Sequence, residues 1–392
     1  MADLQSRINI NRRQFMLGAT TLTFAALVGG CKDTTPHAQV QFLKGSVPPQ
    51  LLRRYTSQHP QFPLEFKSVP QLQTLFETLQ ARQGPPAAAP RGMWQNLPFL
   101  GSSAPSALTP SLWSLGDAWL AAAIKENLLQ PLPLNELASW RSLPPRWSRL
   151  VQRNGQGYLS PEGAFWGAPY RWGTTLLVYS QSRFKNLGWT PQDWPDLWRS
   201  PLRQKIALMD ASREVIGLTL KKLGYSYNEA QPQKIAELLP ALQALQAQVK
   251  FYSSRHSLQS LLMGDVWLVV GWSNEVLPLL KTQPDLAAVI PRSGTSLWSD
   301  IWVAPKGESL DGFLPWIENS WQPESVNQIS LLTSGSSPGL ESLAATAILP
   351  AVRHNPLINV PPSLLARCEF LEPLTESSEA AYAELWQKMR LS

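Results

Sequence analysis

The chain has 392 residues, of which 44% are hydrophobic and 16% are charged. This length exceeds what one hydrophobic core usually supports, and the composition excludes disorder as the main state. The formal net charge is +6, but the basic residues are scattered without a run of five or more, so the sequence gives little support to nucleic-acid binding. We therefore expect a well-packed protein with two lobes.

The first thirty residues carry a pattern typical of export. Arg12 and Arg13 precede the apolar run MLGATTLTFAALVGG, which is too short for a comfortable permanent membrane span and ends at Cys31. Small residues before a cysteine allow a lipoprotein signal peptidase to cut there, after which the thiol can take a diacylglycerol. We expect residues 1–30 to be a twin-arginine lipoprotein signal peptide. An ordinary signal peptide followed by a chance cysteine is the alternative.

Cysteine usage favours the lipoprotein interpretation. The chain has only two cysteines, so lipidation of Cys31 leaves Cys368 as an unpaired thiol and the fold without a disulfide. A lipid anchor at Cys31 predicts a periplasmic protein held at the outer face of the cytoplasmic membrane.

Strand and helix patterns alternate along the rest of the chain. Residues 83–91, QGPPAAAPR, predict a loop. Ser212 is the predicted N-cap of the helix over 213–223. In chain order, the predicted elements are a strand over 40–45, a helix over 48–60, a strand over 62–69, a helix over 114–132, a strand over 163–180, a short helix at 193–198, a strand over 205–209, helices over 213–223 and 232–249, a strand over 265–272, a helix over 273–281, strands over 287–291 and 296–305, and a helix over 375–390. This α/β alternation predicts mostly parallel sheets, with ligands bound beyond the carboxyl ends of the strands.

Residues suited to catalysis are scarce. The four histidines are isolated among polar residues, and none has the spacing of a metal site. The Gly- and Ser-rich stretch LTSGSSPG at 332–339 lacks the lysine of a phosphate loop and the Gly-x-Ser-x-Gly turn of a hydrolase. We therefore expect a protein that is not an enzyme, with no metal and no cofactor.

Tryptophans and carboxylates give the first indication of a ligand. Trp172, Trp272 and Trp298 fall at the ends of predicted strands, and Glu214 and Asp300 lie beside them in the predicted arrangement. Indole faces attract cations and carboxylates hydrogen-bond to ammonium groups, so this set would suit an elongated organic amine. Two simpler explanations stay open, because tryptophan is an ordinary core residue and Glu214 stands in the first turn of a helix, where a negative charge is favoured.

Asp300 raises a separate question, because it lies in the middle of the apolar strand SLWSDIWVAP. Aspartate is depleted in strands, and an unpaired charge in an apolar surround costs several kcal/mol. Either Asp300 is exposed on an alternating strand or it meets a positive group.

Five segments in chain order resemble the spermidine/putrescine-binding proteins of bacterial ABC importers. They are LKGSVPPQLLRRY, PYRWGTTLLVYSQSRF, DLWRSPLRQKIALMDASREVIGLTLKKLGYS, MGDVWLVVGWSNEVLPLLK and SLWSDIWVAP. The resemblance implies a type II periplasmic-binding fold, in which two α/β lobes with mixed, mostly parallel sheets flanked by helices close on a ligand in the cleft between them. We expect lobe 1 to comprise 38–168 with 301–340, and lobe 2 to comprise 169–300 with 341–392.

The resemblance also implies roles for individual residues. Asp300 would hold an amine of the ligand, Glu214 would hold another, and Trp298 would line the site. Trp272 would stack on the methylene chain, and Trp172 matches a position at the crossing between the lobes.

The chain departs from the family pattern in two places: in the first lobe, and at two adjacent acids that the family has before the helix that carries Glu214. Where the family has a Thr-Glu pair after its first strand, this chain has Lys44-Gly45, so a carboxylate is replaced and an ammonium is added. Of two adjacent acids before the helix that carries Glu214, only Asp210 remains. The stretch SLGDAWL could supply Asp117 and Trp119 in place of an aromatic loop.

These observations predict a monomeric, lipid-anchored solute-binding component of an ABC importer that captures a polyamine and delivers it to permease subunits. Lys44 keeps an amino acid-like or anionic solute open as an alternative ligand. A sensor or assembly lipoprotein with the same fold is a further alternative.

Overall fold

The structure is a computed structural model that describes residues 38–83 and 111–391. Arg12, Arg13, Cys31 and most of the predicted loop over 83–91 lie outside the described residues. The described residues all belong to one compact unit. Among the described residues, no helix is long and apolar enough to cross a membrane.

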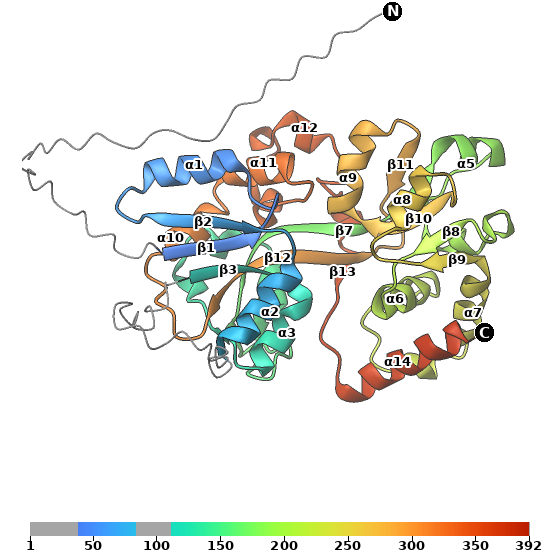
Figure 1. Ribbon diagram of the computed structural model, residues 1–392, viewed down its shortest axis with the longest axis horizontal. Helices are drawn as coiled ribbons and strands as arrows, with labels where there is room; N and C mark the ends of the chain where they lie inside the picture. Colours follow the sequence, from blue (N-terminus) through green and yellow to red (C-terminus); the bar gives the residue numbers. More distant parts are fainter. Residues whose placement is uncertain (1–37, 84–110, 392) are drawn as a thin grey trace, which may run out of the picture. The chain divides into compact units, whose positions relative to one another are not determined.

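Eleven of the described strands form one large mixed sheet whose two halves belong to two lobes (Figure 1), and two short strands, β5 (Gln152–Arg153) and β6 (Ala164–Phe165), form a separate sheet. Its main path runs, from one edge to the other, through β2 (Leu64–Val69), β1 (Ala38–Leu43), β3 (Ser111–Gly116), β12 (Ser296–Pro305), β7 (Ala168–Ser180), β10 (Leu268–Trp272), β8 (Ile206–Leu208) and β9 (Val249–Tyr252). The pairs β1–β2, β1–β3, β8–β10 and β8–β9 are parallel, whereas β7 and β12 are antiparallel to their main-path neighbours. The sheet is therefore parallel toward both edges and antiparallel at the centre.

Strand β7 connects the two halves because it changes partner along its length. Up to Thr174 it pairs with β12, and from Thr175 onward it pairs with β10 and with β11 (Leu286–Val289). Figure 1 shows β7 and β12 running across the middle, between β1–β3 on one side and β8–β10 on the other. The parallel strands of both halves end toward this crossing, which places the loops that follow them near each other.

Helices cover both faces of each half of the sheet. The helices that follow strand ends at the crossing are α1 (Pro49–Gln58), α3 (Asp117–Lys125), α6 (Ser212–Lys222) and α9 (Ser273–Thr282). The others used below are α2 (Leu72–Gln83), α4 (Pro145–Val151), α5 (Gln181–Leu187), α7 (Leu238–Gln248), α8 (Ser257–Leu262), α11 (Pro323–Leu332) and α14 (Glu376–Arg390).

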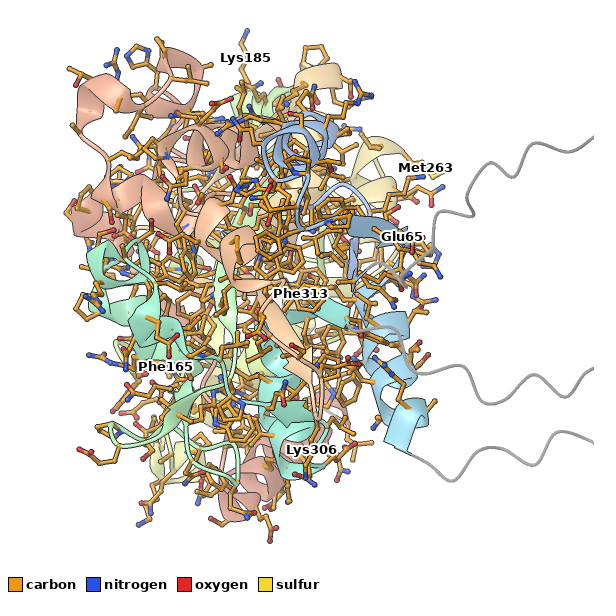
Figure 2. All side chains as sticks on the ribbon, turned by 90° about the vertical axis from the view of Figure 1, so that its left-hand side faces the viewer. Glu65, Phe165, Lys185, Met263, Lys306 and Phe313 are labelled. Carbon is orange, nitrogen blue, oxygen red and sulfur yellow. The ribbon has the colours of Figure 1, made fainter. Side chains whose placement is uncertain are left out.

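Side-chain alternation on the strands separates the hydrophobic core into clusters. On β10, Val269 packs into the larger cluster that also contains the lobe 1 core, whereas Leu268 and Val270 pack into a second cluster with α6, α7 and α14. This follows from the two-residue period of a strand that is covered on both faces. Phe313, labelled in Figure 2, is a buried member of the larger cluster, whereas Met263 of the same view is exposed.

Several predicted element boundaries are wrong: the helix predicted over 232–249 starts only at Leu238 as α7, and two further differences lie close to the site. The helix predicted over 114–132 begins only at Asp117 and ends at Lys125, because Ser111–Gly116 form the fully buried strand β3 between β1 and β12. Ser212 is not the N-cap of α6, because it is already helical and Ala211 occupies the cap position without a side-chain bond.

Candidate functional site

Asp300 is buried and paired with an arginine from the neighbouring strand. Its register partner on β7 is Arg171, and Arg171 Nε donates a hydrogen bond to Asp300 Oδ2 at 2.8 Å. The two residues are only 2% and 3% exposed. Burial raises the pKa of the Asp300 carboxyl, and the Arg171 charge opposes that shift. Of the two explanations left open by the sequence, Asp300 therefore meets a positive group.

Arg171 also contacts two further groups at the crossing. Its Nη1 donates to the Thr333 carbonyl oxygen at 3.1 Å, and its guanidinium lies 5.2 Å from the ring centre of Trp298. Trp298 is half-buried and stands opposite Gly173 in the β7–β12 register. The aromatic face predicted for a ligand amine thus has a protein guanidinium over it.

Glu214 lies at the first turn of α6 and bonds to hydroxyl groups. Its carboxylate accepts hydrogen bonds from Ser296 Oγ at 2.6 Å and from Thr175 Oγ1 at 3.5 Å. Burial raises the pKa of Glu214, and bonds from Ser296 and from half-buried Trp272 lower it. No lysine or arginine nitrogen among the described residues lies within 4.0 Å of it. Glu214 therefore has no ion-pair partner at this distance among the described residues, and the charge of neighbouring Arg213 lowers its pKa only as the last of the causes.

Asp117 is the corresponding carboxylate of lobe 1. It begins α3, and its Oδ1 accepts a hydrogen bond from the Ser299 backbone N–H at 3.0 Å. Burial raises the pKa of Asp117 to about 7, although the Ser299 bond and the Arg153 charge lower it. Asp117 therefore changes its charge near neutral pH, next to the crossing strand that carries Asp300.

A pH-dependent stability follows from the raised pKa of Asp117. The unfolded carboxyl loses its proton near pH ~3.9, whereas the folded one keeps it up to about pH 7. The folded state thus binds the extra proton, and the stabilisation is present at low pH and lost as the pH rises through about 7. Asp117→Asn should remove this loss, so its stability relative to wild type should rise by about 3 kcal/mol between pH 4.5 and pH 8 in urea unfolding. A difference that stays constant with pH would contradict the assignment.

Three other predicted site residues, Trp172, Trp119 and Asp210, contact protein groups away from Asp300 and Glu214. Trp172 is buried against Trp147 at a ring distance of 5.7 Å, on the opposite face of β7 from Arg171. Trp119 stacks on Phe76 of α2 at 6.2 Å and so packs within lobe 1. Asp210 is exposed and forms an ion pair at 3.2 Å with Arg390 of α14. The structure thus gathers Asp300 and Trp298 around Arg171, and Glu214 with Trp272, whereas Trp119 and Asp210 contact other partners.

Lys44 and Gly45 form the turn after β1 and border a cavity. Gly45 has a φ of 82°, a backbone conformation that favours glycine. The cavity measures about 250 Å³ and is lined by Leu43, Lys44, Gly45, Arg171, Asn274, Pro278, Leu332, Thr333 and Ser334. We call it the Lys44 cavity. Because Lys44 follows β1 and Asn274 lies in α9, the cavity is bounded by segments from both halves of the sheet.

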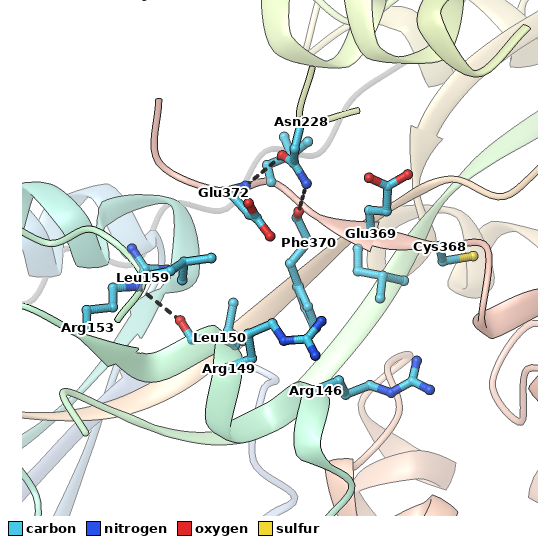
Figure 3. Close-up of a pocket in the computed structure, with 12 residues that line it drawn as sticks. Arg146, Arg149, Leu150, Arg153, Leu159, Asn228, Cys368, Glu369, Phe370 and Glu372 are labelled. Carbon is cyan, nitrogen blue, oxygen red and sulfur yellow. Dashed lines mark hydrogen bonds between the residues drawn. The ribbon is translucent and has the colours of Figure 1, made fainter. Parts of the chain in front are cut away.

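A second cavity, which we call the Arg153 cavity, is lined by residues that the sequence did not predict as ligand-binding (Figure 3). It measures about 240 Å³ and is lined by Arg146, Arg149, Leu150, Arg153, Leu159, Asn228, Leu297 and the segment 368–372. None of the predicted ligand-binding residues lines it. The spacing of Arg146 and Arg149 could have indicated a basic helix face, because residues three apart share one side of a helix, whereas Arg153 lies in the short strand Gln152–Arg153 that follows α4. The pKa of Arg153 is lowered to about 10 by burial, against the opposing charges of Asp117 and Glu372.

Comparison with known proteins identifies the family. The chain matches the family described as bacterial extracellular solute-binding protein over residues 101–354. It belongs to this family. The spermidine/putrescine-binding periplasmic protein of Salmonella typhimurium is 24% identical over 268 residues, which cover 68% of this chain and 73% of the relative. The putrescine/cadaverine-binding protein of Pseudomonas aeruginosa is 25% identical over 263 residues, covering 62% of this chain and 73% of the relative.

Solved structures agree on the architecture of this solute-binding protein. The spermidine/putrescine ABC transporter substrate-binding protein PotD from Streptococcus pneumoniae has a TM-score of 0.73 and 19% identity, with coverage of 91% of this chain and 99% of that one. The predicted α/β fold of two-lobed periplasmic solute-binding proteins is thereby confirmed.

Proposed function

We propose that the protein is the lipid-anchored, non-catalytic solute-binding component of an ABC importer and that its ligand is an organic amine, with polyamines the first choice. Family membership supports the solute-binding role, and relatives named for spermidine, putrescine and cadaverine support the amine. The anchor is proposed at Cys31, and delivery is proposed to membrane permease subunits, with the binding protein acting as a monomer in the periplasm after twin-arginine export.

The observation that carries the amine proposal is the pair of carboxylates without a cationic side chain within 4.0 Å. Glu214 in the second half of the sheet and Asp117 in the first both lie near the crossing strands, and the bonds given for them in the described part of the chain come from hydroxyl, indole or backbone groups. Desolvation raises the pKa of each, so an ammonium group that approached them would gain a strong charge-assisted hydrogen bond. Trp272 and Trp298, both half-buried, would line the methylene chain.

Lobe closure would provide the mechanism of capture. In this proposal the lobes are 38–168 with 301–340 and 169–300 with 341–392, joined by β7, β12 and the segment before α14. Rotation about these connections would bring Asp117 and Glu214 onto one solute, and the closed form would be recognised by the permease.

A second candidate keeps the fold and the transport role but assigns an amino acid-like or anionic solute. Two observations favour it. Arg171 already occupies Asp300, which therefore has no free charge for a ligand amine. Lys44 places a further positive charge at the turn after β1.

Calorimetric titration of the purified protein with putrescine, spermidine, amino acids and small anions tests the proposal. We expect amines to bind and Glu214→Gln to weaken them by at least ~1.5 kcal/mol, the scale of a charge-assisted hydrogen bond. Glu275→Gln is the matched control, because Glu275 occupies the first turn of α9 but is exposed. Absence of heat with every amine would overturn the amine ligand.

A further inference from the structure

Positive charge dominates the Lys44 cavity. Its lining contains Lys44 and Arg171 and no acidic residue. The Lys44 ammonium has no hydrogen-bond or ion-pair partner among the described residues, and the side chain is exposed. Since Asp300 neutralises Arg171, the free charge at this cavity is the charge of Lys44.

Arg171 still has donor capacity toward a ligand after its internal bonds are made. Its Nε is used by Asp300 and its Nη1 by the Thr333 carbonyl oxygen, whereas no hydrogen bond of Nη2 occurs among the described residues. Arg171 is only 3% exposed, and its bonds to Asp300 and Thr333 hold the guanidinium in place. A guanidinium offers donors in a rigid fork that matches the oxygens of a carboxylate or phosphate.

Asn274 completes a polar wall on the other side of the cavity. It lies in the first turn of α9, where a negative charge is favoured by the helix dipole. Pro278 and Leu332 supply apolar surface beside these groups. Groups from the turn after β1, from β7 and from α9 therefore converge on one small space, as in a site that closes around its ligand.

We propose that the Lys44 cavity binds an anionic group of the solute, so that the ligand is an amine that also carries a carboxylate or another small anion. This inference rests on the proposed solute-binding function and puts an amine with an anionic group ahead of a polyamine as the ligand. Lys44 contributes the charge, Arg171 Nη2 and Asn274 contribute hydrogen bonds, and Glu214 or Asp117 remains for the amine. A diamine that bound Glu214 or Asp117 with one ammonium and reached this cavity with the other would place the second ammonium beside Lys44, where like charges repel.

Three four-carbon solutes with different end groups make the test sharp: putrescine with two amines, 4-aminobutyrate with one amine and one carboxylate, and succinate with two carboxylates. We expect wild type to bind 4-aminobutyrate at least about tenfold more tightly than putrescine, on the scale of one charged hydrogen bond. Lys44→Glu should reverse this order. Lys185→Glu on α5, an exposed lysine outside the cavity that is labelled in Figure 2, should leave it unchanged within about twofold.

Competition with inorganic phosphate distinguishes the kind of anion. Displacement of 4-aminobutyrate by phosphate but not by acetate would assign the cavity to phosphate-like groups, and the reverse would assign it to carboxylates; either supports the inference. Tighter binding of putrescine than of 4-aminobutyrate, with Lys44→Glu neutral, would overturn the inference and leave the polyamine proposal standing. Absence of binding by all amines tested would overturn both.

Discussion

Replacing Arg171 by methionine should lower the free energy of unfolding by about 3–5 kcal/mol, because it leaves a buried carboxylate without its partner. Asp300 lies between β3 and β7 in the sheet register, with its carboxylate 2.8 Å from Arg171 Nε. Water cannot replace the lost charge at a residue that is 2% exposed. Urea unfolding of wild type and Arg171→Met measures the difference.

Two comparisons separate this effect from a general loss of packing. Asp300→Asn should also be strongly destabilising, and the double variant Arg171→Met/Asp300→Asn should cost clearly less than the sum, since the second change removes the orphaned charge. Asp210→Asn makes the same chemical change at the exposed pair with Arg390, whose side chains are 57% and 39% exposed, and should cost below about 1 kcal/mol. Equal losses at Asp300 and Asp210 would contradict the buried-pair account.

The pH dependence of the Arg171→Met variant has a definite sign. Burial raises the pKa of Asp300 in the folded state, and removal of Arg171 removes the charge that opposes this rise. An acid whose folded pKa is raised stabilises the fold at low pH and loses this contribution as the pH rises. The deficit relative to wild type should therefore be larger at pH 8 than at pH 4.5, and the opposite trend would count against an unpaired Asp300.

The strand and helix alternation was readable from the sequence because it depends on local patterns. The predicted strand 296–305 coincides with β12, and the predicted helix 273–281 differs from α9 by one residue. Strand β3 was missed because all six of its residues are buried, so it lacks the alternation that separates a strand from a buried helix. The sequence prediction placed its first three helical residues, 114–116, inside this strand.

The sequence could predict which residues lie near the site, but not which side chains they contact. Arg171 and Asp300 are separated by 129 residues, and their contact depends on the antiparallel register of β7 and β12, which no local pattern gives. Asp210 matches a family motif but binds Arg390, 180 residues away, on the C-terminal helix. Trp119 follows Asp117 by two residues and lies on a different side of the helix, where it meets Phe76. Long-range pairing thus decides which carboxylates remain free for a ligand.

Gly173→Ala should both destabilise the fold and weaken ligand binding, because no space exists for a methyl group at this position. A Cβ on Gly173 would lie 2.2 Å from Ser273 Oγ and 2.5 Å from the Trp298 ring. Ser273 is buried at the start of α9, and its hydroxyl accepts a hydrogen bond from the Thr174 N–H at 3.1 Å, so it cannot move freely. We expect a loss of about 1–3 kcal/mol in urea unfolding, typical of overpacking.

Gly271→Ala on β10 is the matched control, since its added Cβ would first meet Val276 at 3.4 Å and should cost below about 1 kcal/mol. The effect of Gly173→Ala on affinity has a separate cause. Gly173 lies just before β7 changes partner from β12 to β10, so displacing Trp298 there alters the aromatic wall and the connection between the lobes together. Adding Trp298→Leu should recover only part of the lost stability, because the contact with Ser273 Oγ remains, and should not recover ligand affinity. If Gly173→Ala leaves both quantities unchanged, Trp298 is not held against the crossing, and an indole at this point cannot line the bound solute.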